Sequence, residues 1–351
     1  MTRRFASIIG WGHYVPDRVV TNDDLAALVD TSDDWIQSRT GIRERRYVAD
    51  GQATSDLCVR AAQRALQVAE VEPDEVDLVI VSSSSPDYRI PPVSSQVQAG
   101  LGAVDAGALT VGTGCAGFVY ALVTAEQFIA SGAARTVVVV GGETLSRYLD
   151  FSNRATCVLF GDGAGALVLQ ASPQPCGSLT FELGSDGTRA EAIISRASGS
   201  AMPPTPEALE AHLQHVSLDG RAVFRFATGV IADSVRRVTE DVGMSVDDLD
   251  FLIPHQANAR ILERAAKALG LPEEKLVMNV DRYGNTSSAS IPIAMSELLS
   301  DGRAAPGDTL ALVGFGTGLA WATSLFQLGP LEPWPMPTTA EVLALPALVA
   351  P

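Results

Sequence analysis

Short, uninterrupted apolar runs alternate along this chain with longer segments of helical periodicity. Apolar runs of this length are typical of strands that are buried on both faces. Segment 116–132 places its apolar residues on one helical face and ends at Gly132, where a C-cap glycine belongs. The pattern predicts an α/β protein. Its clearest strands are VDLVIVSS, RTVVVVGG, LDFLIPH and DTLALVGFG, at residues 76–83, 135–142, 249–255 and 308–316.

A shift of 173 residues aligns two parts of the chain with each other. It places EPDEVDLVIV (72–81) on SVDDLDFLIP (245–254), and ARTVVVVGG (134–142) on GDTLALVGF (307–315). Each match alone is weak, because an acidic turn followed by an apolar strand is common. Two matches at one offset indicate a duplicated α/β unit.

The duplication predicts how the chain is divided. We expect an N-terminal half at 1–170, a C-terminal half at 171–330 and a proline-rich tail at 331–351 that is extended or frayed. In a duplicated α/β protein, the functional site is expected where strand-end loops of the two halves meet.

Composition narrows the classes of function. The formal net charge of −16 argues against nucleic acid as the main partner, since no Lys/Arg stripe stands out. No run of about 18 apolar residues predicts a membrane span. The apolar segment at the start is broken by Gly10, Gly12 and His13, which makes it too short for a signal peptide. We therefore expect a soluble, cytoplasmic protein.

Neither the cysteines nor the histidines predict a metal site. The four cysteines are widely spaced and include no C-x-x-C pair, so they indicate neither a disulfide framework nor a zinc site. His212 and His215 are three residues apart, but their polar stretch offers no further ligand candidate. We interpret that stretch as a solvated helix face.

Cys115 is the candidate nucleophile. It lies between an apolar strand and the first turn of the predicted helix, where unpaired N–H groups favour a thiolate and lower the pKa of a thiol. Gly112, Gly114 and Gly117 around it also spell G-x-G-x-x-G, the dinucleotide fingerprint. That motif needs an acidic residue about 20 positions on, whereas Glu143 comes about thirty residues after Gly112. The spacing favours the nucleophile over a dinucleotide site.

Three further features could complete a site. His255 follows a strand of the second half and corresponds to Ser82 under the 173-residue shift, so it should lie at a strand end. A core or capping histidine is the alternative. Asn285 follows Gly284 in a hydroxyl-rich turn, where it could equally be a turn residue. The glycine-rich segment 315–318 is suited to present backbone N–H groups to an oxyanion.

Together and in this order, these residues resemble the β-ketoacyl-acyl carrier protein synthase III family over about residues 5–328. The resemblance implies a duplicated thiolase-like fold, with two similar α/β halves and central mixed sheets in layers of helices. The segments that carry it are TSDDWIQSRTGIRERR (31–46), GCAGFVYAL (114–122), RATCVLFGDGAGALVL (154–169), PHQANARI (254–261), GNTSSASIP (284–292) and FGTGLAWA (315–322).

The resemblance also implies roles for single residues. Cys115, His255 and Asn285 form its catalytic triad, and the backbone N–H groups of Cys115 and Thr317 form the oxyanion hole. The family usually has three glycines where this chain has F-G-T-G, so the Thr317 side chain could alter the preferred acyl shape. Ile90 matches a position that reaches the acyl pocket of a partner subunit, which implies a homodimer. The positions matched to coenzyme A and its pantetheine channel are Trp35, Arg39, Arg154, Arg221, Asn258 and Arg260.

The implied reaction is an acyl transfer followed by condensation. Acyl-CoA loads Cys115, and malonyl-acyl carrier protein then decarboxylates and takes the acyl group, so acyl-CoA serves as substrate and no other cofactor or metal is expected. Relatives that move an acyl group to a hydroxyl without condensation are the alternative, and a non-catalytic binding module is a third class. We further expect an acidic carrier protein to dock on a local basic patch of Arg225, Arg260, Arg264 and Lys267, which could also be an ordinary solvated helix face.

Overall fold

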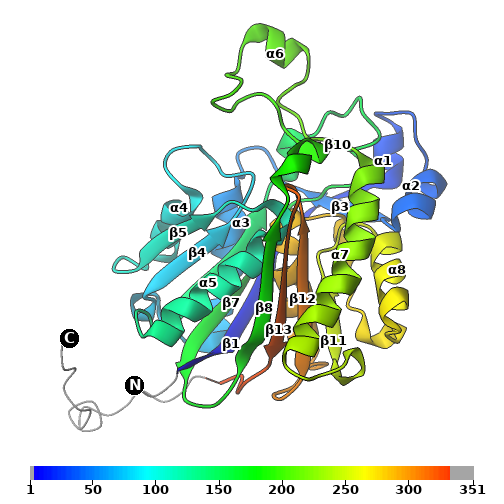
Figure 1. Ribbon diagram of the computed structural model, residues 1–351. Helices are drawn as coiled ribbons and strands as arrows, with labels where there is room; N and C mark the ends of the chain where they lie inside the picture. The colour runs from blue at the N-terminus through cyan, green and yellow to red at the C-terminus, as the bar shows by residue number, and fades with distance from the viewer. Residues whose placement is uncertain (1–3, 333–351) are drawn as a thin grey trace.

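Two β-sheets form the centre of the computed structural model, which describes residues 4–332 (Figure 1). The first sheet has the strand order β1-β7-β6-β4-β5, and the second has the order β11-β12-β13-β8. The strands of the first sheet are β1 (Phe5–Tyr14), β4 (Leu78–Ser82), β5 (Gly107–Val111), β6 (Thr136–Glu143) and β7 (Gly163–Ser172). Those of the second are β8 (Gly177–Ser185), β11 (Phe251–Pro254), β12 (Thr309–Gly316) and β13 (Ala320–Gln327).

The two sheets repeat one arrangement. In the first, β4 is parallel to β6, and β7 and β1 follow antiparallel. In the second, β11 is parallel to β12, and β13 and β8 follow antiparallel. The 173-residue shift carries β6 onto β12 end to end and carries β4 onto β11. The predicted duplicated α/β fold is confirmed, and β5 is an addition at one edge of the first sheet.

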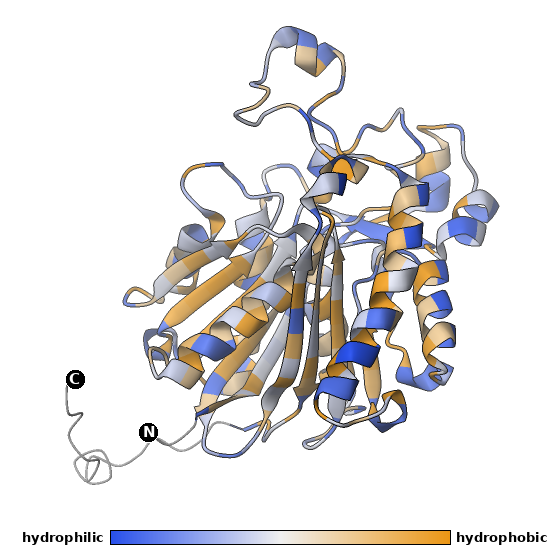
Figure 2. Ribbon diagram, in the orientation of Figure 1, coloured by the Kyte–Doolittle hydropathy of each residue, from blue (hydrophilic) through white to orange (hydrophobic). Residues whose placement is uncertain are grey.

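Helices form three layers around the sheets. Between the sheets lie α5 (Gly117–Ser131) and α10 (Ser290–Ser300), which contact strands of both and share one apolar core with them. The outer face of the first sheet is covered by α3 (Thr54–Ala69) and α4 (Val93–Leu101). The outer face of the second is covered by α7 (Gly220–Asp241) and α8 (Ala259–Leu269). Because helices cover their faces, the central strands are apolar along their length (Figure 2).

Shorter elements connect the main helices and strands. The strands β9 (Ile193–Ile194) and β10 (Ser217–Leu218) pair at the base of an excursion, residues 195–216, that projects from the body and carries α6 (Pro206–Glu210) (Figure 1). The other short elements are β2 (Arg18–Thr21), β3 (Glu44–Tyr47), α1 (Asn22–Ala26), α2 (Asp33–Thr40) and α9 (Val280–Tyr283). The 3-10 turns are η1 (Pro73–Glu75), η2 (Gly114–Ala116), η3 (Leu145–Tyr148), η4 (Gly187–Ala192), η5 (Val246–Asp248), η6 (Glu273–Lys275) and η7 (Ser287–Ala289).

Two expectations about particular segments can be compared with the structure. The predicted helix face at His212 and His215 is wrong, because α6 ends at Glu210 and both histidines follow it. The predicted tail at 331–351 lies almost entirely outside the described residues, and the boundary near residue 170 stays a prediction. Within residues 4–332, every helix is too short or too polar to cross a membrane.

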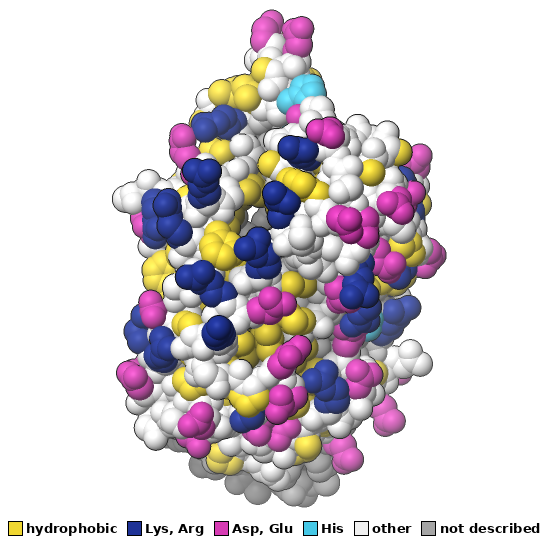
Figure 3. Space-filling model, turned by 90° about the vertical axis from the view of Figure 1, so that its right-hand side faces the viewer, with side chains coloured by type: hydrophobic (Ala, Val, Ile, Leu, Met, Phe, Trp, Pro, Cys, Tyr) yellow, Lys and Arg dark blue, Asp and Glu magenta, His cyan; other side chains and the backbone are white. Residues whose placement is uncertain are grey.

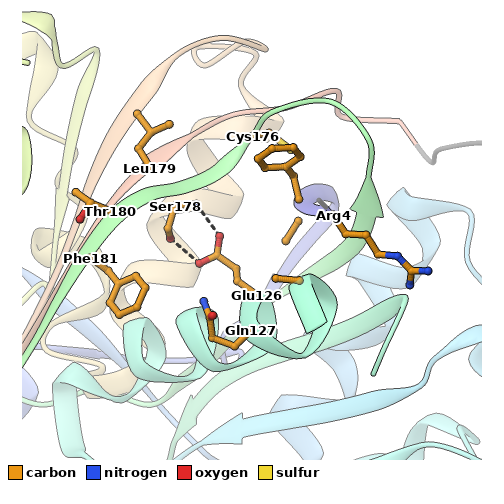
Figure 4. Close-up of a pocket in the computed structure, with 11 residues that line it drawn as sticks. Arg4, Glu126, Gln127, Cys176, Ser178, Leu179, Thr180 and Phe181 are labelled. Atoms are coloured by element: carbon orange, nitrogen blue, oxygen red, sulfur yellow. Dashed lines mark hydrogen bonds between the residues drawn. The ribbon is translucent and has the colours of Figure 1, made fainter. Parts of the chain in front are cut away.

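A buried glutamate ties α5 to β8 (Figure 4). The two carboxylate oxygens of Glu126 lie 2.6 Å from the backbone nitrogen and 2.5 Å from Oγ of Ser178. Glu126 also borders a cavity of about 390 Å³, in which Arg4 points its guanidinium away from the carboxylate. Burial raises the pKa of Glu126 to about 7, and the hydrogen bonds from Ser178 oppose this shift. The glutamate is therefore a structural link whose strength depends on pH.

This link predicts a pH-dependent effect of Glu126→Gln. The folded state holds the Glu126 proton up to about pH 7, whereas the unfolded state releases it near the usual value of 4.5, so stability falls as pH rises through that window. An amide does not titrate. Relative to the parent, the variant should gain roughly 3 kcal/mol in free energy of unfolding between pH 5 and 8, measured by urea denaturation. The exposed Glu240→Gln is the control, and parallel pH curves for parent and Glu126→Gln would contradict the assignment.

Candidate active site

A cavity of about 730 Å³ lies at the carboxyl ends of β4, β6 and β12. Ser84, Leu145 and Thr317, which border it, follow these three strands by one or two positions. Residues of both halves line the cavity, and Cys115 is among them. The structure thus places the candidate nucleophile where strand-end loops of the two halves meet, which is where ligands bind in α/β folds.

Cys115 is the only cysteine in the described chain whose side chain is partly exposed; the other three are buried. It lies in η2, directly ahead of α5, and its sulfur forms hydrogen bonds with the Ser287 hydroxyl and with the backbone of Cys115 and Thr317. The predicted lowering of its pKa is nevertheless wrong. Burial raises the pKa of Cys115 to about 12, and these hydrogen bonds offset the burial only in part. Before substrate binds, Cys115 is therefore a neutral thiol.

Two glycines let Thr317 approach this sulfur. A Cβ added at Gly316 would lie 3.0 Å from Sγ of Cys115, and one added at Gly114, which has a φ of +56°, would lie 2.2 Å from Cγ2 of Thr317. Oγ1 of Thr317 donates to the carbonyl of Ile193 at 2.9 Å, which fixes the side chain. The two backbone N–H groups predicted for the oxyanion hole, those of Cys115 and Thr317, thus both reach the sulfur.

His255 follows β11 directly and is only 1% exposed. Its Nδ1 lies 3.1 Å from Oγ of Ser290, and its ring packs edge-on against Phe315 with centroids 5.1 Å apart. Burial lowers the pKa of His255 to about 3, although a hydrogen bond with the backbone of Ser287 favours the charged form. The imidazole is therefore neutral throughout the physiological range of pH.

Ser287 connects the three residues of the predicted triad. Its backbone N–H donates to Oδ1 of Asn285 at 2.9 Å, its backbone also bonds His255, and its hydroxyl contacts the sulfur of Cys115. Ser287 adopts a φ of +50°, which is uncommon for a residue with a side chain. Cys115 and Ser287 border the cavity, whereas His255 and Asn285 do not. The sequence offered no signal for Ser287 beyond its position in a hydroxyl-rich turn.

Behind Ser287 lies Glu143, a fully buried carboxylate at the end of β6. Oε1 accepts hydrogen bonds from the hydroxyls of Ser287 at 3.0 Å and Ser288 at 2.9 Å. Backbone N–H groups and hydroxyls of residues 83–85 also donate to the carboxylate, at 2.5 to 3.3 Å. Burial raises the pKa of Glu143, and the donors oppose that shift. The hydrogen-bond donors around it favour the carboxylate form, but burial outweighs them and the net shift of the pKa is upward. Sequence reasoning used Glu143 only to reject a dinucleotide site.

Four of the residues matched to coenzyme A lie together at the surface. The guanidinium carbons of Arg39 and Arg154 lie 4.5 and 5.1 Å from the ring centroid of Trp35. Asn258 caps α8 through the backbone N–H of Arg260 and donates to the carbonyl of Arg39 at 2.9 Å. None of these residues borders the 730 Å³ cavity. Arg221 lies apart from them by sequence, in the first turn of α7.

The predicted docking residues are exposed on two neighbouring helices. Arg225 belongs to α7, and Arg260, Arg264 and Lys267 belong to α8; the exposed Arg221 lies one turn before Arg225. Arg264 reaches across to α7, where its guanidinium lies 6.0 Å from the ring centroid of Phe224. The face to the right in Figure 1 gathers Lys and Arg side chains over its upper half (Figure 3). A local basic surface thus exists on a chain with a net charge of −16.

Comparison with known proteins finds similarity to 3-oxoacyl-[acyl-carrier-protein] synthases III. Residues 109–187 match the family model "3-Oxoacyl-[acyl-carrier-protein (ACP)] synthase III", and residues 239–328 match the model of its C-terminal part. The chain is 45% identical over 322 residues to the beta-ketoacyl-[acyl-carrier-protein] synthase III of Caldanaerobacter subterraneus, which covers 92% of this chain and 97% of the relative.

Solved structures agree with the sequence matches. The crystal structure of 3-oxoacyl-[acyl-carrier-protein] synthase III from Aquifex aeolicus VF5 has a TM-score of 0.85 at 38% identity and covers 92% of this chain and 99% of that one. The priming beta-ketosynthase of the R1128 polyketide biosynthetic pathway has a TM-score of 0.86 at 35% identity and covers 93% of this chain and 98% of that one.

The raised pKa of Cys115 predicts an unusual alkylation profile. The thiolate is the nucleophile, so a thiol with a pKa of about 12 should react with iodoacetamide at a rate that keeps rising between pH 7 and 9. Labelling should nevertheless be confined to Cys115, because the other three cysteines are buried. Peptide mass spectrometry measures both. A rate that levels off below pH 8.5 would show that the thiol is activated instead.

The hydrogen-bond donors around Glu143 predict that Glu143→Gln lowers stability but makes Cys115 more reactive. The NH2 group that replaces one carboxylate oxygen cannot accept hydrogen bonds, so the serines that donate to that oxygen lose their acceptor, which should lower the free energy of unfolding by about 1–3 kcal/mol. The negative charge that helps to raise the pKa of Cys115 is also lost, so alkylation of Cys115 at pH 7 should become faster. Glu126→Gln, at an equally buried glutamate away from Cys115, should leave alkylation unchanged. A folded Glu143→Gln protein with unchanged or slower alkylation would contradict the electrostatic role.

Proposed function

This chain belongs to the 3-oxoacyl-[acyl-carrier-protein] synthase III family, a group of acyl-transferring condensing enzymes, and we propose that it condenses an acyl group from acyl-CoA with malonyl-acyl carrier protein. Cys115 would carry the acyl group, and the product would be a 3-ketoacyl-carrier protein. The observation that carries this proposal is the set of Ser287 contacts, which joins Cys115, His255 and Asn285 beside a cavity.

The first half-reaction transfers the acyl group to Cys115. The sulfur attacks the acyl-CoA carbonyl, the bond from that carbonyl to the coenzyme A sulfur breaks, and the Cys115 proton leaves on coenzyme A. The backbone N–H groups of Cys115 and Thr317 would stabilise the oxyanion of the tetrahedral intermediate. Because these donors already reach the sulfur, they need little rearrangement as negative charge develops.

The second half-reaction makes the carbon–carbon bond. Malonyl-carrier protein loses carbon dioxide, and the electrons of the broken bond form an enolate. We assign the tautomer in which Nδ1 of His255 accepts from the Ser290 hydroxyl, 3.1 Å away. The neutral ring then carries its proton on Nε2 and would share the thioester carbonyl with the Asn285 amide. The enolate carbon then attacks the acyl carbonyl, and Cys115 leaves as a thiolate that regains a proton. These steps use acyl-CoA as substrate and no further cofactor.

An exposed apolar edge supports a homodimer. Ile90 is 89% exposed, and Tyr88 and Leu109 are also large and exposed. Leu109 belongs to β5, the edge strand of the first sheet, whose backbone groups have no neighbour on one side. A second copy covering this edge would bury these side chains and bring Ile90 to the partner's acyl cavity. We further propose that the dimer works in the cytoplasm and that the Thr317 side chain influences which acyl groups fit.

Separate measurement of the half-reactions tests the proposal. Cys115→Ala should lose acylation but keep slow malonyl decarboxylation, because the enolate-stabilising donors remain. His255→Ala should acylate but decarboxylate about a hundred- to a thousandfold more slowly, since it loses one donor. Asn285→Ala should behave similarly but more mildly if water replaces the amide. Acyl-protein mass and carbon dioxide release are the readouts, and His13→Asn, at a histidine paired with Ser296, is the control.

A transferase without condensation would give a different pattern. The parent protein would release no carbon dioxide from malonyl-carrier protein, and His255→Ala would fail only in passing the acyl group to an alcohol. Absence of decarboxylation by the parent protein with a competent carrier would overturn the condensing function.

The basic surface on α7 and α8 predicts a separate carrier-protein effect. Arg260→Glu with Arg264→Glu should raise KM for malonyl-carrier protein and make it less sensitive to salt, while acylation by acyl-CoA is spared. Steady-state kinetics at two ionic strengths measure both, and the exposed Arg18→Glu on β2 is the control. An equal fall in both half-reactions would assign the surface to coenzyme A or to structure.

A further inference from the structure

A third cluster of chemically reactive side chains lies outside the triad and the coenzyme A residues. Asp150, His212 and His215 each offer one ligand atom, and these atoms all lie within 4.8 Å of one another. Within residues 4–332, no other group of three or more His, Cys, Asp or Glu side chains has this geometry. We propose that these three side chains bind Zn²⁺ or a similar divalent transition metal and thereby join two walls of the active-site cavity.

The fold brings a third ligand, Asp150, next to the two histidines. His212 and His215 alone are two ligands in a polar stretch, but Asp150 comes from a segment 62 residues away, with Oδ2 at 2.9 Å from Nδ1 of His212. The two imidazole rings stand nearly perpendicular, at 86°, with centroids 5.4 Å apart. Tetrahedral zinc, with bonds of about 2.0–2.1 Å, needs ligand atoms about 3.3 Å apart. Small side-chain movements would close the cluster to that spacing, and a water molecule would be the fourth ligand.

A metal would replace the hydrogen bond between Asp150 and His212, and it would bind His215 through Nδ1, because Nε2 of His215 already contacts Nε2 of Gln214 at 3.3 Å. Oδ1 of Asp150 is held by the backbone nitrogen and Oγ of Ser152, at 2.9 and 2.6 Å, so that Oδ2 faces His212. Such outer contacts orient metal ligands in known sites. Nδ1 of His215 is buried and has no hydrogen-bond partner in the described part of the chain, which is costly for an imidazole nitrogen without a ligand.

The chemistry of the cluster selects the class of metal. Two imidazoles and one carboxylate suit zinc and its neighbours, whereas calcium and magnesium prefer sets of oxygen ligands. The side chain of His212 is 52% exposed and that of Asp150 is 19% exposed, so an ion can enter from solvent. The cluster is therefore an accessible site with one open position.

The two segments that meet here are walls of the 730 Å³ cavity. Arg147 and Tyr148 line it just before Asp150, and Gln214 and Val216 line it on either side of His215. Among the described residues, the only backbone–backbone hydrogen bond between the segments at this point runs from the N–H of Val216 to the carbonyl of Tyr148. A bound metal would add a second connection and hold the return of the excursion 195–216 against η3. If the proposed function holds, zinc should thus alter the entry or fit of the acyl donor.

Metal binding itself is measured without any reference to activity. Equilibrium dialysis against Zn²⁺, with metal analysis by mass spectrometry, should give one equivalent per chain in a Cys115→Ala background, which removes the accessible thiol. His212→Ala and His215→Ala in that background should each bind at least about tenfold more weakly, since losing even an outer contact costs that much. Glu210→Gln, an exposed change two residues from His212, should bind like the background. Equal binding in all four proteins, or none in the background, overturns the site.

Cobalt substitution identifies the ligands independently. Co²⁺ in the background protein should give visible d–d bands without thiolate charge-transfer absorption, and His215→Ala should abolish the bands. Thiolate absorption would assign the metal to a cysteine and overturn the proposal.

The effect on the cavity has its own readout. Zn²⁺ should change the acylation rate or the acyl-length preference of the protein with Cys115 intact, and His215→Ala should be insensitive to zinc while its rate without metal stays at the parent level. Tight zinc binding with unchanged acylation would keep the site but overturn its effect on the cavity. Absence of acylation in every protein would refute the proposed function and leave the dialysis result standing.

Discussion

A carboxylate with no exposed surface, that of Glu143, is held where the two halves of the molecule meet, and the loops around Cys115 are built on it. Residues 83–85 of the first half and Ser287 and Ser288 of the second half all donate to it. A buried carboxylate is tolerated only if its hydrogen bonds are satisfied, so both loops must stay in place for either to be stable. Because Ser287 contacts Cys115, His255 and Asn285, the position of Ser287 also fixes the positions of these three residues.

Burial also keeps the side chains of Cys115 and His255 neutral. Burial raises the pKa of Cys115 to about 12 and lowers the pKa of His255 to about 3, so neither holds a charge before a substrate arrives. The site is instead rich in fixed donors, which include the backbone N–H of Thr317 and the amide of Asn285. Donors in a water-excluded site act most strongly on charge that develops during the reaction. An arrangement of this kind suits the formation of an oxyanion and an enolate, each of which carries negative charge only briefly.

Local pattern and duplication made most of the fold predictable from the sequence. The apolar runs became β4, β6, β11 and β12, and one offset of 173 residues related the halves, because a strand buried on both faces leaves a continuous signature. The grouping of Cys115, His255 and Asn285 came from the family resemblance, whereas the other contacts between distant segments were not predictable. The thiol of Cys115 was expected to be acidic because its place before α5 is local information, whereas its burial depends on Gly316 and Ser287 from the other half. Glu143 looked like a strand end, and Asp150 gave no sign of its proximity to His212.

The central claim is that Cys115 carries an acyl group that malonyl-carrier protein then removes. Intact-protein mass spectrometry after incubation with a panel of acyl-CoA donors tests it most directly. The account predicts a gain of one acyl group with at least one donor, located on the peptide that contains Cys115, and its loss together with release of carbon dioxide when malonyl-carrier protein is added. An unchanged mass with every donor, or an adduct on another residue, would contradict it.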